Sequence, residues 1–328
     1  MKKLFIAVMA VAAMASCAQE EVILNNNKAI EFGDAFVNNA TKAIYEGDEK
    51  VNIFQVWGTV EGTSGTPVAL YEGAEVKREG KEYGVAWTCD VARFWTPNCD
   101  YNFYAVVDAN EVNATNGVPS TIEYTAVANG DQDLLYGATS KTTKTDLAQP
   151  AGGSLVAFTM QHLLSKISFK FTNPESNGDY SYNVTAVTVD GAYASGTYTI
   201  THDAANIDGT YHGSWAGTGT AAQLSFGAVT GTIASKGTAA AAKSCLIIPG
   251  EPELTINVTT ETVFNGAILE TKTHTLTVNK TAEDTNVTFE KNTHYNFAVT
   301  LPAPGVEIDL TIGTVSGFGG GTPDTTIQ

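Results

Sequence analysis

The chain has 328 residues, of which 43% are hydrophobic and only 16% are charged. This length suffices for one large or two ordinary domains with real hydrophobic cores. The formal net charge of −17 argues against a nucleic-acid partner, because phosphate backbones need basic patches on the protein. The abundance of Gly, Thr, Ala and Val favours β-sheet and turns over charged amphipathic helices.

The start of the chain is typical of an export signal. Two lysines precede an apolar run that ends at Ala13, and Met14-Ala15-Ser16-Cys17 follows as a small-residue cleavage region. The run is too short to span a bilayer. Residues 1–16 resemble a bacterial lipoprotein signal, with Cys17 as the lipidated first residue of the mature chain; an ordinary secretory signal is the alternative. Residues 17–28 are predicted to form a polar tether.

The first predicted strand covers residues 29–37, where apolar and polar residues alternate. A polar hinge, Thr41-Lys42-Ala43, follows this strand. A trypsin-like protease could cut the hinge after Lys42.

Short strands separated by Gly, Pro, Asn and Asp turns continue along the chain, and no window shows a convincing helical stripe. The strands that we expect cover residues 51–60, 101–107, 167–171, 182–189, 196–200, 244–249, 254–259, 274–278 and 295–301. Turn residues 174–179 are the best candidate for a boundary. The pattern predicts an all-β fold with two sandwiches in series, over residues 29–174 and 175–328. The strand at 167–171 is expected to be the last strand of the first sandwich.

The last predicted strand alternates in the same way, with Val306, Ile308, Leu310 and Ile312 on one face. No predicted helix or strand follows it. Both terminal strands therefore offer one buriable face and a row of backbone hydrogen-bonding groups, and one could replace the other between molecules. Terminal strands of sandwiches usually complete their own sheets, and this is the alternative for both ends.

Several landmarks occur in a specific order along the chain. They are the lipoprotein-like signal, an Ile-x-Phe strand at 30–32, the Thr-Lys-Ala hinge, Trp95 near Pro97, Tyr101-Asn102-Phe103-Tyr104-Ala105, Asp133-Leu134-Leu135-Tyr136, residues 158–167 with His162-Leu163-Leu164-Ser165-Lys166, Leu246-Ile247-Ile248-Pro249 and a Tyr295-x-Phe strand. Together they resemble the fimbrillin family, the type V pilins of Bacteroides and relatives.

This resemblance implies a cell-surface fimbrial subunit that supports adhesion. Such a subunit is exported as a lipoprotein, with palmitate as the expected lipid holding the precursor in the outer membrane. It folds as two transthyretin-like β-sandwiches. A trypsin-like surface protease removes the first strand, here residues 29–42, by cutting between Lys42 and Ala43. A donor strand of another subunit, here about residues 306–318, then fills the groove. Expected partners are other copies of the chain and other pilin subunits.

Two other functions are compatible with the sequence. The chain could be an anchor or tip subunit of the fimbria. It could also be a monomeric outer-membrane lipoprotein that binds glycan or a host ligand, with a stacking platform among Trp57, Trp87, Trp95 and Trp215. Tryptophans beside strand patterns more often belong to a core.

Cys89 and Cys99 bracket a nine-residue turn between predicted strands, so a disulfide is possible in an oxidising compartment. Two free thiols are the alternative. Cys245 is predicted to be a buried, small apolar residue.

The sequence gives no support for an enzyme, a cofactor or a metal site. The histidines are scattered, and no pair has a metal-ligand spacing. A metal site at His202 and His212, near Asp203 and Asp208, is the weak alternative. The chain has no nucleophile elbow or phosphate-binding loop.

Overall fold

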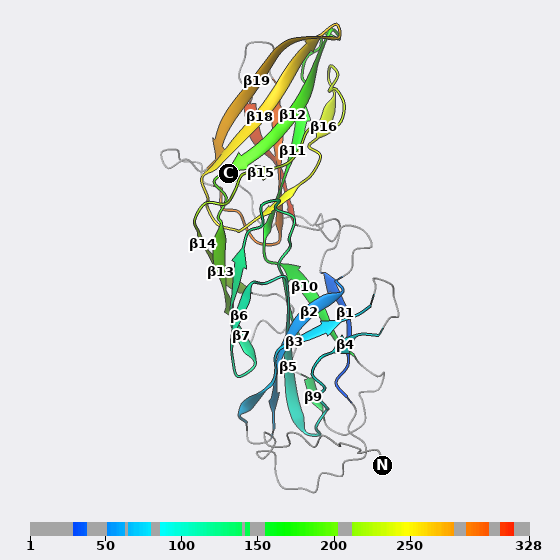
Figure 1. Cartoon of the computed structure of the whole chain (residues 1–328), viewed down its shortest axis with the longest axis vertical. Helices are drawn as coiled ribbons and strands as arrows, with labels where there is room; N and C mark the ends of the chain where they lie inside the picture. The colour runs from blue at the N-terminus through cyan, green and yellow to red at the C-terminus, as the bar shows by residue number, and fades with distance from the viewer. Residues whose placement is uncertain are drawn as a thin grey trace, which may run out of the picture.

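The regular structure of the described chain is entirely β, as predicted. The computed structural model describes residues 29–37, 51–62, 65–79, 86–139, 142–144, 155–202, 212–278, 287–301 and 309–317. Two lobes follow one another along the long axis of the molecule, with a smaller sheet beside their junction (Figure 1). The described residues include no helix that is long and apolar enough to cross a membrane. The transthyretin-like arrangement of each sandwich stays a prediction.

The first lobe is built on one large sheet with the strand order β1-β10-β8-β5-β2-β3-β4, in which β9 also pairs with β5. Its strands are β1 (Phe32–Val37), β2 (Ile53–Glu61), β3 (Pro67–Lys77), β4 (Thr88–Cys89), β5 (Cys99–Val107), β8 (Leu135–Ala138), β9 (Thr142–Lys144) and β10 (Val156–His162). The β1–β10 pair is parallel and the other pairs are antiparallel. The core of this lobe includes Phe54, Tyr71, Phe103 and Phe158.

A second sheet joins strands from both predicted sandwiches, in the order β14-β13-β7-β6. Its strands are β6 (Glu111–Thr115), β7 (Val118–Thr125), β13 (Ser195–Thr201) and β14 (His212–Thr218). An apolar cluster packs with it, and this cluster includes Tyr124, Leu164, Tyr198 and Ile248. The two lobes therefore share main-chain hydrogen bonds and buried side chains.

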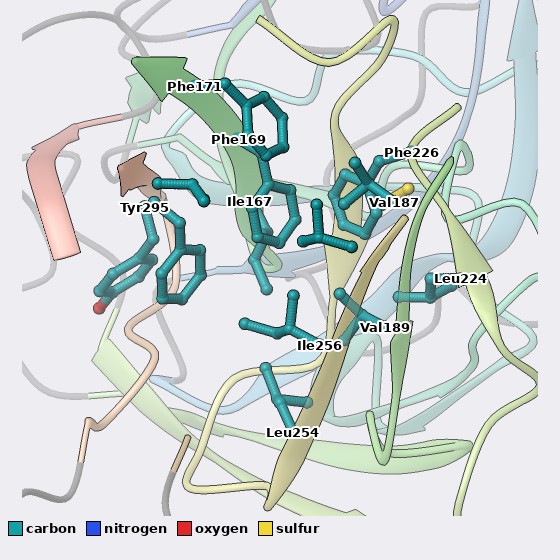
Figure 2. Close-up of a cluster of buried hydrophobic side chains, with 14 of the residues drawn as sticks. Ile167, Phe169, Phe171, Val187, Val189, Leu224, Phe226, Leu254, Ile256 and Tyr295 are labelled. Atoms are coloured by element: carbon teal, nitrogen blue, oxygen red, sulfur yellow. The ribbon is translucent and has the colours of Figure 1, made fainter. Parts of the chain in front are cut away.

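Two sheets face each other in the second lobe. One has the order β16-β11-β20-β21, with β17 also paired to β11, and the other has the order β15-β12-β18-β19. Their strands are β11 (Ser165–Thr172), β12 (Tyr180–Asp190), β15 (Leu224–Ser225), β16 (Thr238–Ala240), β17 (Cys245–Ile247), β18 (Leu254–Phe264), β19 (Ala267–Val278), β20 (Thr293–Thr300) and β21 (Asp309–Gly317). Figure 2 shows the side chains of Phe169, Val187, Phe226 and Ile256 gathered between them.

The partners of β11 differ from the expectation. We expected the strand at 167–171 to close the first sandwich, but β11 runs parallel to β20 and also pairs with β16 and β17 in the second lobe. The physical reason is its apolar face: Ile167 and Phe169 lie opposite Tyr295 and Phe297, and all four are buried in one core. The alternation of apolar and polar residues correctly predicted this strand, but such a pattern cannot identify the strand that pairs with it. The predicted ranges of the two sandwiches stay a prediction.

Candidate functional site

The segment that contains β1 lies in a seam of the first lobe. On one side, β1 runs parallel to β10, with Phe32 opposite Val156. On the other side, Ala29 forms an antiparallel bridge with Phe94, which follows β4 in the chain. The sheet order begins at β1 and ends at β4, so this short segment contacts a loop that follows the strand at the other end of the sheet.

Main-chain hydrogen bonds hold the segment on both sides. The N–H of Ile30 donates to the carbonyl oxygen of Arg93 at 2.8 Å. The carbonyl oxygen of Glu31 accepts from the N–H of Val156, also at 2.8 Å. Ile30 and Phe32 are buried while Glu31 between them is exposed, which is the period of two expected for a strand with one buried face. We call residues 29–32, held in this way, the seam segment.

Phe32 anchors the seam segment in an aromatic pocket. Its side chain is 3% exposed. Its ring centroid lies 6.1 Å from that of Phe54 on β2, 5.6 Å from Tyr71 on β3, 6.1 Å from Phe103 on β5 and 6.4 Å from Phe158 on β10. Burial of a phenylalanine contributes about 1.5–3 kcal/mol, and each favourable aromatic pair adds about 0.5–1.5 kcal/mol. Removal of the seam segment would expose these four rings.

The loop after β4 is held firmly against the sheet. The Nε of Arg93 donates to the carbonyl oxygen of Leu70 on β3 at 2.9 Å. A pocket of about 320 Å³ lies beside this contact and is lined by β3 residues 69–74 together with Asp90, Val91 and Arg93. The Tyr71 hydroxyl is buried and has no hydrogen-bond partner among the described residues, and burial raises its pKa. The loop that forms one wall of the seam is thus also tied to β3.

The predicted donor strand completes a sheet of its own chain in this structure. β21 is antiparallel to β20, with Leu310 opposite Val299 and Ile312 opposite Phe297. It forms the end of the sheet order β16-β11-β20-β21. Val306 and Ile308 lie outside the described residues. β1 and β21 belong to sheets of different lobes, so the donor role of β21 stays a prediction (Figure 1).

The predicted processing residues also lie outside the described residues. These are Cys17, the proposed lipidation site, and Lys42 with Ala43, the proposed cleavage site. β1 ends at Val37, five positions before Lys42.

The possible disulfide is not formed, because Cys89 and Cys99 are both free thiols. The sheet explains why. Cys89 lies on β4, which is separated from β5 by β2 and β3, whereas Cys99 begins β5. Three strand spacings amount to about 14 Å, and the Cα atoms of a disulfide lie within about 7 Å of each other. Cys245 is buried, as predicted.

The histidines do not converge on one site. His162 and Asp133 form a buried pair at 2.6 Å, and His294 contacts Ser168 at 2.7 Å. His202 contacts the carbonyl oxygen of Pro119. The part of the chain that the structure describes contains no group of three or more His, Cys, Asp or Glu side chains that could hold a metal ion.

The four tryptophans make contacts inside the protein. Trp57 and Trp95 are buried. Trp87 packs against Phe54, with ring centroids 5.2 Å apart, and Trp215 donates from Nε1 to the carbonyl oxygen of Leu163 at 2.7 Å. Packed rings of this kind are core residues more often than ligand platforms.

Sequence reasoning identified the first strand but missed the residues that receive it. Arg93 and Phe94 lie in no predicted strand, and the four rings around Phe32 come from four separate strands. The available signal was the alternation of apolar residues in each strand. That signal assigns a residue to a face of a sheet, but it does not show which residues of other strands will contact it.

Comparisons with known proteins agree on a fimbrial family. A family model described as fimbrillin-like matches residues 38–316. A fimbrial protein from Bacteroides vulgatus has a similar structure, with 15% sequence identity and a TM-score of 0.55, and the match covers 81% of this chain and 92% of that chain. At this identity the likeness shows a shared fold. The comparison with curated proteins gave no significant match.

Two further solved structures are similar at lower scores. A fimbrial assembly protein from Parabacteroides distasonis has 14% identity and a TM-score of 0.45, with 89% of this chain and 96% of that chain covered. The tip fimbrial protein Mfa3 from Porphyromonas gingivalis has 11% identity and a TM-score of 0.41, with 88% of this chain and 100% of that chain covered.

We predict that Phe32→Ala lowers the free energy of unfolding of the uncut chain by about 3–5 kcal/mol, because it leaves a cavity between four rings. Leu155→Ala is the matched control: Leu155 precedes β10, lies beside the seam segment and is 48% exposed, so its loss should cost less than about 1 kcal/mol. Denaturant unfolding measures both. Equal losses would contradict the anchoring role of Phe32.

We also predict that, among the three cysteines that the structure describes, alkylation of the native protein labels Cys89 first, because it is partly exposed, whereas Cys99 and Cys245 are buried. Burial raises the pKa of both Cys89 and Cys245, the latter to about 11, so less thiolate is present at neutral pH and labelling should speed up as the pH rises. Mass spectrometry after brief iodoacetamide treatment, with a denatured control, measures the order. Joint protection of Cys89 and Cys99 that is lost on reduction would contradict free thiols.

Proposed function

The chain belongs to the fimbrillin-like family, and on that premise we propose that it is a structural subunit of a cell-surface fimbria, polymerised by strand exchange at the seam. The family is one of fimbrial proteins and is not an enzyme family, and the role that we propose is structural. The observation that carries the proposal is the seam segment: it is hydrogen-bonded on both sides and inserts one aromatic anchor.

The seam is suited to receive a strand from another molecule. Its hydrogen bonds to Ile30 and Glu31 join main-chain groups, which any extended segment can supply. Its side-chain requirements are an apolar residue at position 30 and a large apolar residue between the four rings at position 32. A vacant seam would leave unpaired edge groups and exposed rings, and a donor strand would cover both.

Cleavage of the chain would determine when the seam segment can be replaced by a strand of another subunit. In the uncut chain, the seam segment is covalently tied to the lobe, so its effective concentration exceeds that of any donor on another molecule. A cut between Lys42 and Ala43 removes this advantage. We propose that a trypsin-like surface protease makes the cut and that residues 29–42 then leave.

The donor that we propose is the C-terminal segment from about residue 306 to residue 318, which includes β21. It alternates apolar residues at Leu310 and Ile312 with polar residues, so it could present one face to the aromatic pocket. β21 ends its sheet in the second lobe, and leaving β20 would break one strand pairing in exchange for the two-sided pairing of the seam.

The same proposal accounts for export. Lipidation at Cys17 would hold the precursor in the outer membrane until cleavage releases it into the fibre. The net charge of −17 would keep subunits soluble at high local concentration. The packed tryptophans do not favour the alternative of a monomeric glycan-binding lipoprotein.

We predict that limited trypsin treatment of the purified precursor produces a chain that starts at Ala43 and then forms boiling-resistant ladders on a gel. Lys42→Gln should block both events, and Lys50→Gln, at the next lysine, should leave both intact. N-terminal sequencing and gel analysis measure the result. Equal ladders from Lys42→Gln and the unchanged precursor would contradict cleavage at Lys42 as the event that starts assembly.

A second prediction concerns the donor. Ile312→Asp should abolish ladders of the cleaved chain, because burial of a carboxylate in an aromatic pocket is strongly unfavourable. Thr311→Asp, on the opposite face of the same strand, is the matched control and should retain them. Unfolding of each uncut variant checks that the second lobe still folds. If both variants assemble normally, the donor strand lies elsewhere and the assignment to β21 is wrong.

A further inference from the structure

The apolar positions of the seam do not by themselves fix which residues of a donor strand enter it. The seam segment buries Ile30 and Phe32, two apolar residues spaced by two. The proposed donor segment, from about residue 306 to residue 318, contains three pairs with this spacing. They are Val306 with Ile308, Ile308 with Leu310, and Leu310 with Ile312. The apolar pattern therefore allows three registers, and a further constraint must select among them.

The position directly after the seam segment supplies this constraint, because it has room only for glycine. Gly33 is buried and lies against Leu155, the residue that precedes β10. A Cβ atom added at Gly33 would lie 2.9 Å from the Cβ and 3.2 Å from the Cδ1 of Leu155. Non-bonded carbon atoms prefer separations of roughly 3.5–4.0 Å. Any larger residue at position 33 would therefore force Leu155 or the main chain to move.

The three apolar pairs of the donor segment differ in the residue that follows them. Asp309 follows the first pair, Thr311 follows the second and Gly313 follows the third. In the first two registers, a carboxylate or a branched side chain would meet Leu155. The third register places a glycine there.

The main chain of β21 has an irregularity at the matching point. Between Phe32 and Ala35, β1 contains one residue more than the corresponding stretch of β10. Gly313 is likewise an extra residue of β21, because Ile312 and Thr314 pair with consecutive residues of β20. An extra residue of this kind bends a strand locally. In both strands, the bend therefore follows the second apolar residue of the pair.

We infer that the donor enters the seam in one register, parallel to β10, with Leu310 at position 30, Ile312 at position 32 and Gly313 at position 33. This register rests on the strand exchange proposed above and adds a selection rule to it. The seam accepts two apolar residues spaced by two with a glycine directly after them, and Leu155 enforces the glycine. The C-terminal segment of this chain meets the rule, so the partner that the seam selects is a second copy of the same chain.

The first arm of the test uses the uncut chain, so it examines Leu155 without strand exchange. Gly33→Val should raise the equilibrium constant for unfolding about tenfold or more, because it overpacks the seam. Leu155→Gly in the same chain should bring the constant to within about threefold of that of Leu155→Gly alone. Gly178→Val is the matched control, since a Cβ atom there would meet no other atom within 4 Å. Denaturant unfolding measures all four variants.

The second arm uses the cleaved chain and the rate at which ladders form on a gel. Gly313→Val should lower this rate about tenfold, and adding Leu155→Gly should restore it to within about threefold of that of Leu155→Gly alone. Leu155 lies beside β10 in the first lobe, so its removal would not repair a defect in the pairing of β21 with β20 in the second. Thr311→Val, at the position that the exposed Glu31 occupies in the uncut chain, is the matched control and should change the rate less than about threefold.

The cleaved chain without substitutions separates the possible results. If it forms no ladders, strand exchange is wrong and the register falls with it. If it forms ladders and Gly313→Val forms them equally fast, or slowly without rescue by Leu155→Gly, the register is overturned while strand exchange stands. Independent effects of Gly33→Val and Leu155→Gly on unfolding would overturn the selection rule.

Discussion

The first lobe depends on a four-residue stretch that is hydrogen-bonded on both sides. The seam segment lies between β10 and the loop that follows β4, the strand at the other end of the sheet. Without it, the lobe would have two unpaired edges and an exposed aromatic pocket, which is unfavourable in water. Phe32 makes the closure cooperative, because one side chain contacts rings from β2, β3, β5 and β10 at once.

The same contacts suit the exchange that we propose for this segment, whereas the rest of the fold does not suit it. Main-chain hydrogen bonds do not depend on sequence, and a pocket for a large apolar side chain is not very selective. The sheet at the junction of the lobes is different. Tyr198 on β13 and Tyr124 on β7 are buried in a cluster shared by both lobes. Exchange of any of these strands would disrupt two cores. In the proposed function, the molecule is therefore a stable block with one exchangeable segment.

The sequence predicted the strands of this protein much better than their neighbours. Alternation at Ile167, Phe169 and Phe171 correctly gave a strand with one buried face, because period-two patterning follows directly from strand geometry. It could not show that the partner is β20, more than 120 residues away. The sequence also could not show that Cys89 and Cys99 lie far apart, because this distance depends on the order of the strands in the sheet. The strand of the candidate site was found and its receiving residues were not.

The seam differs from an ordinary open strand edge in what covers it, and this difference sets the strength of a bond formed there. The seam combines main-chain bonds on both sides with a buried aromatic anchor, so a strand placed there would leave slowly once inserted. In the function that we propose, a fibre joined through the seam would therefore have durable longitudinal bonds.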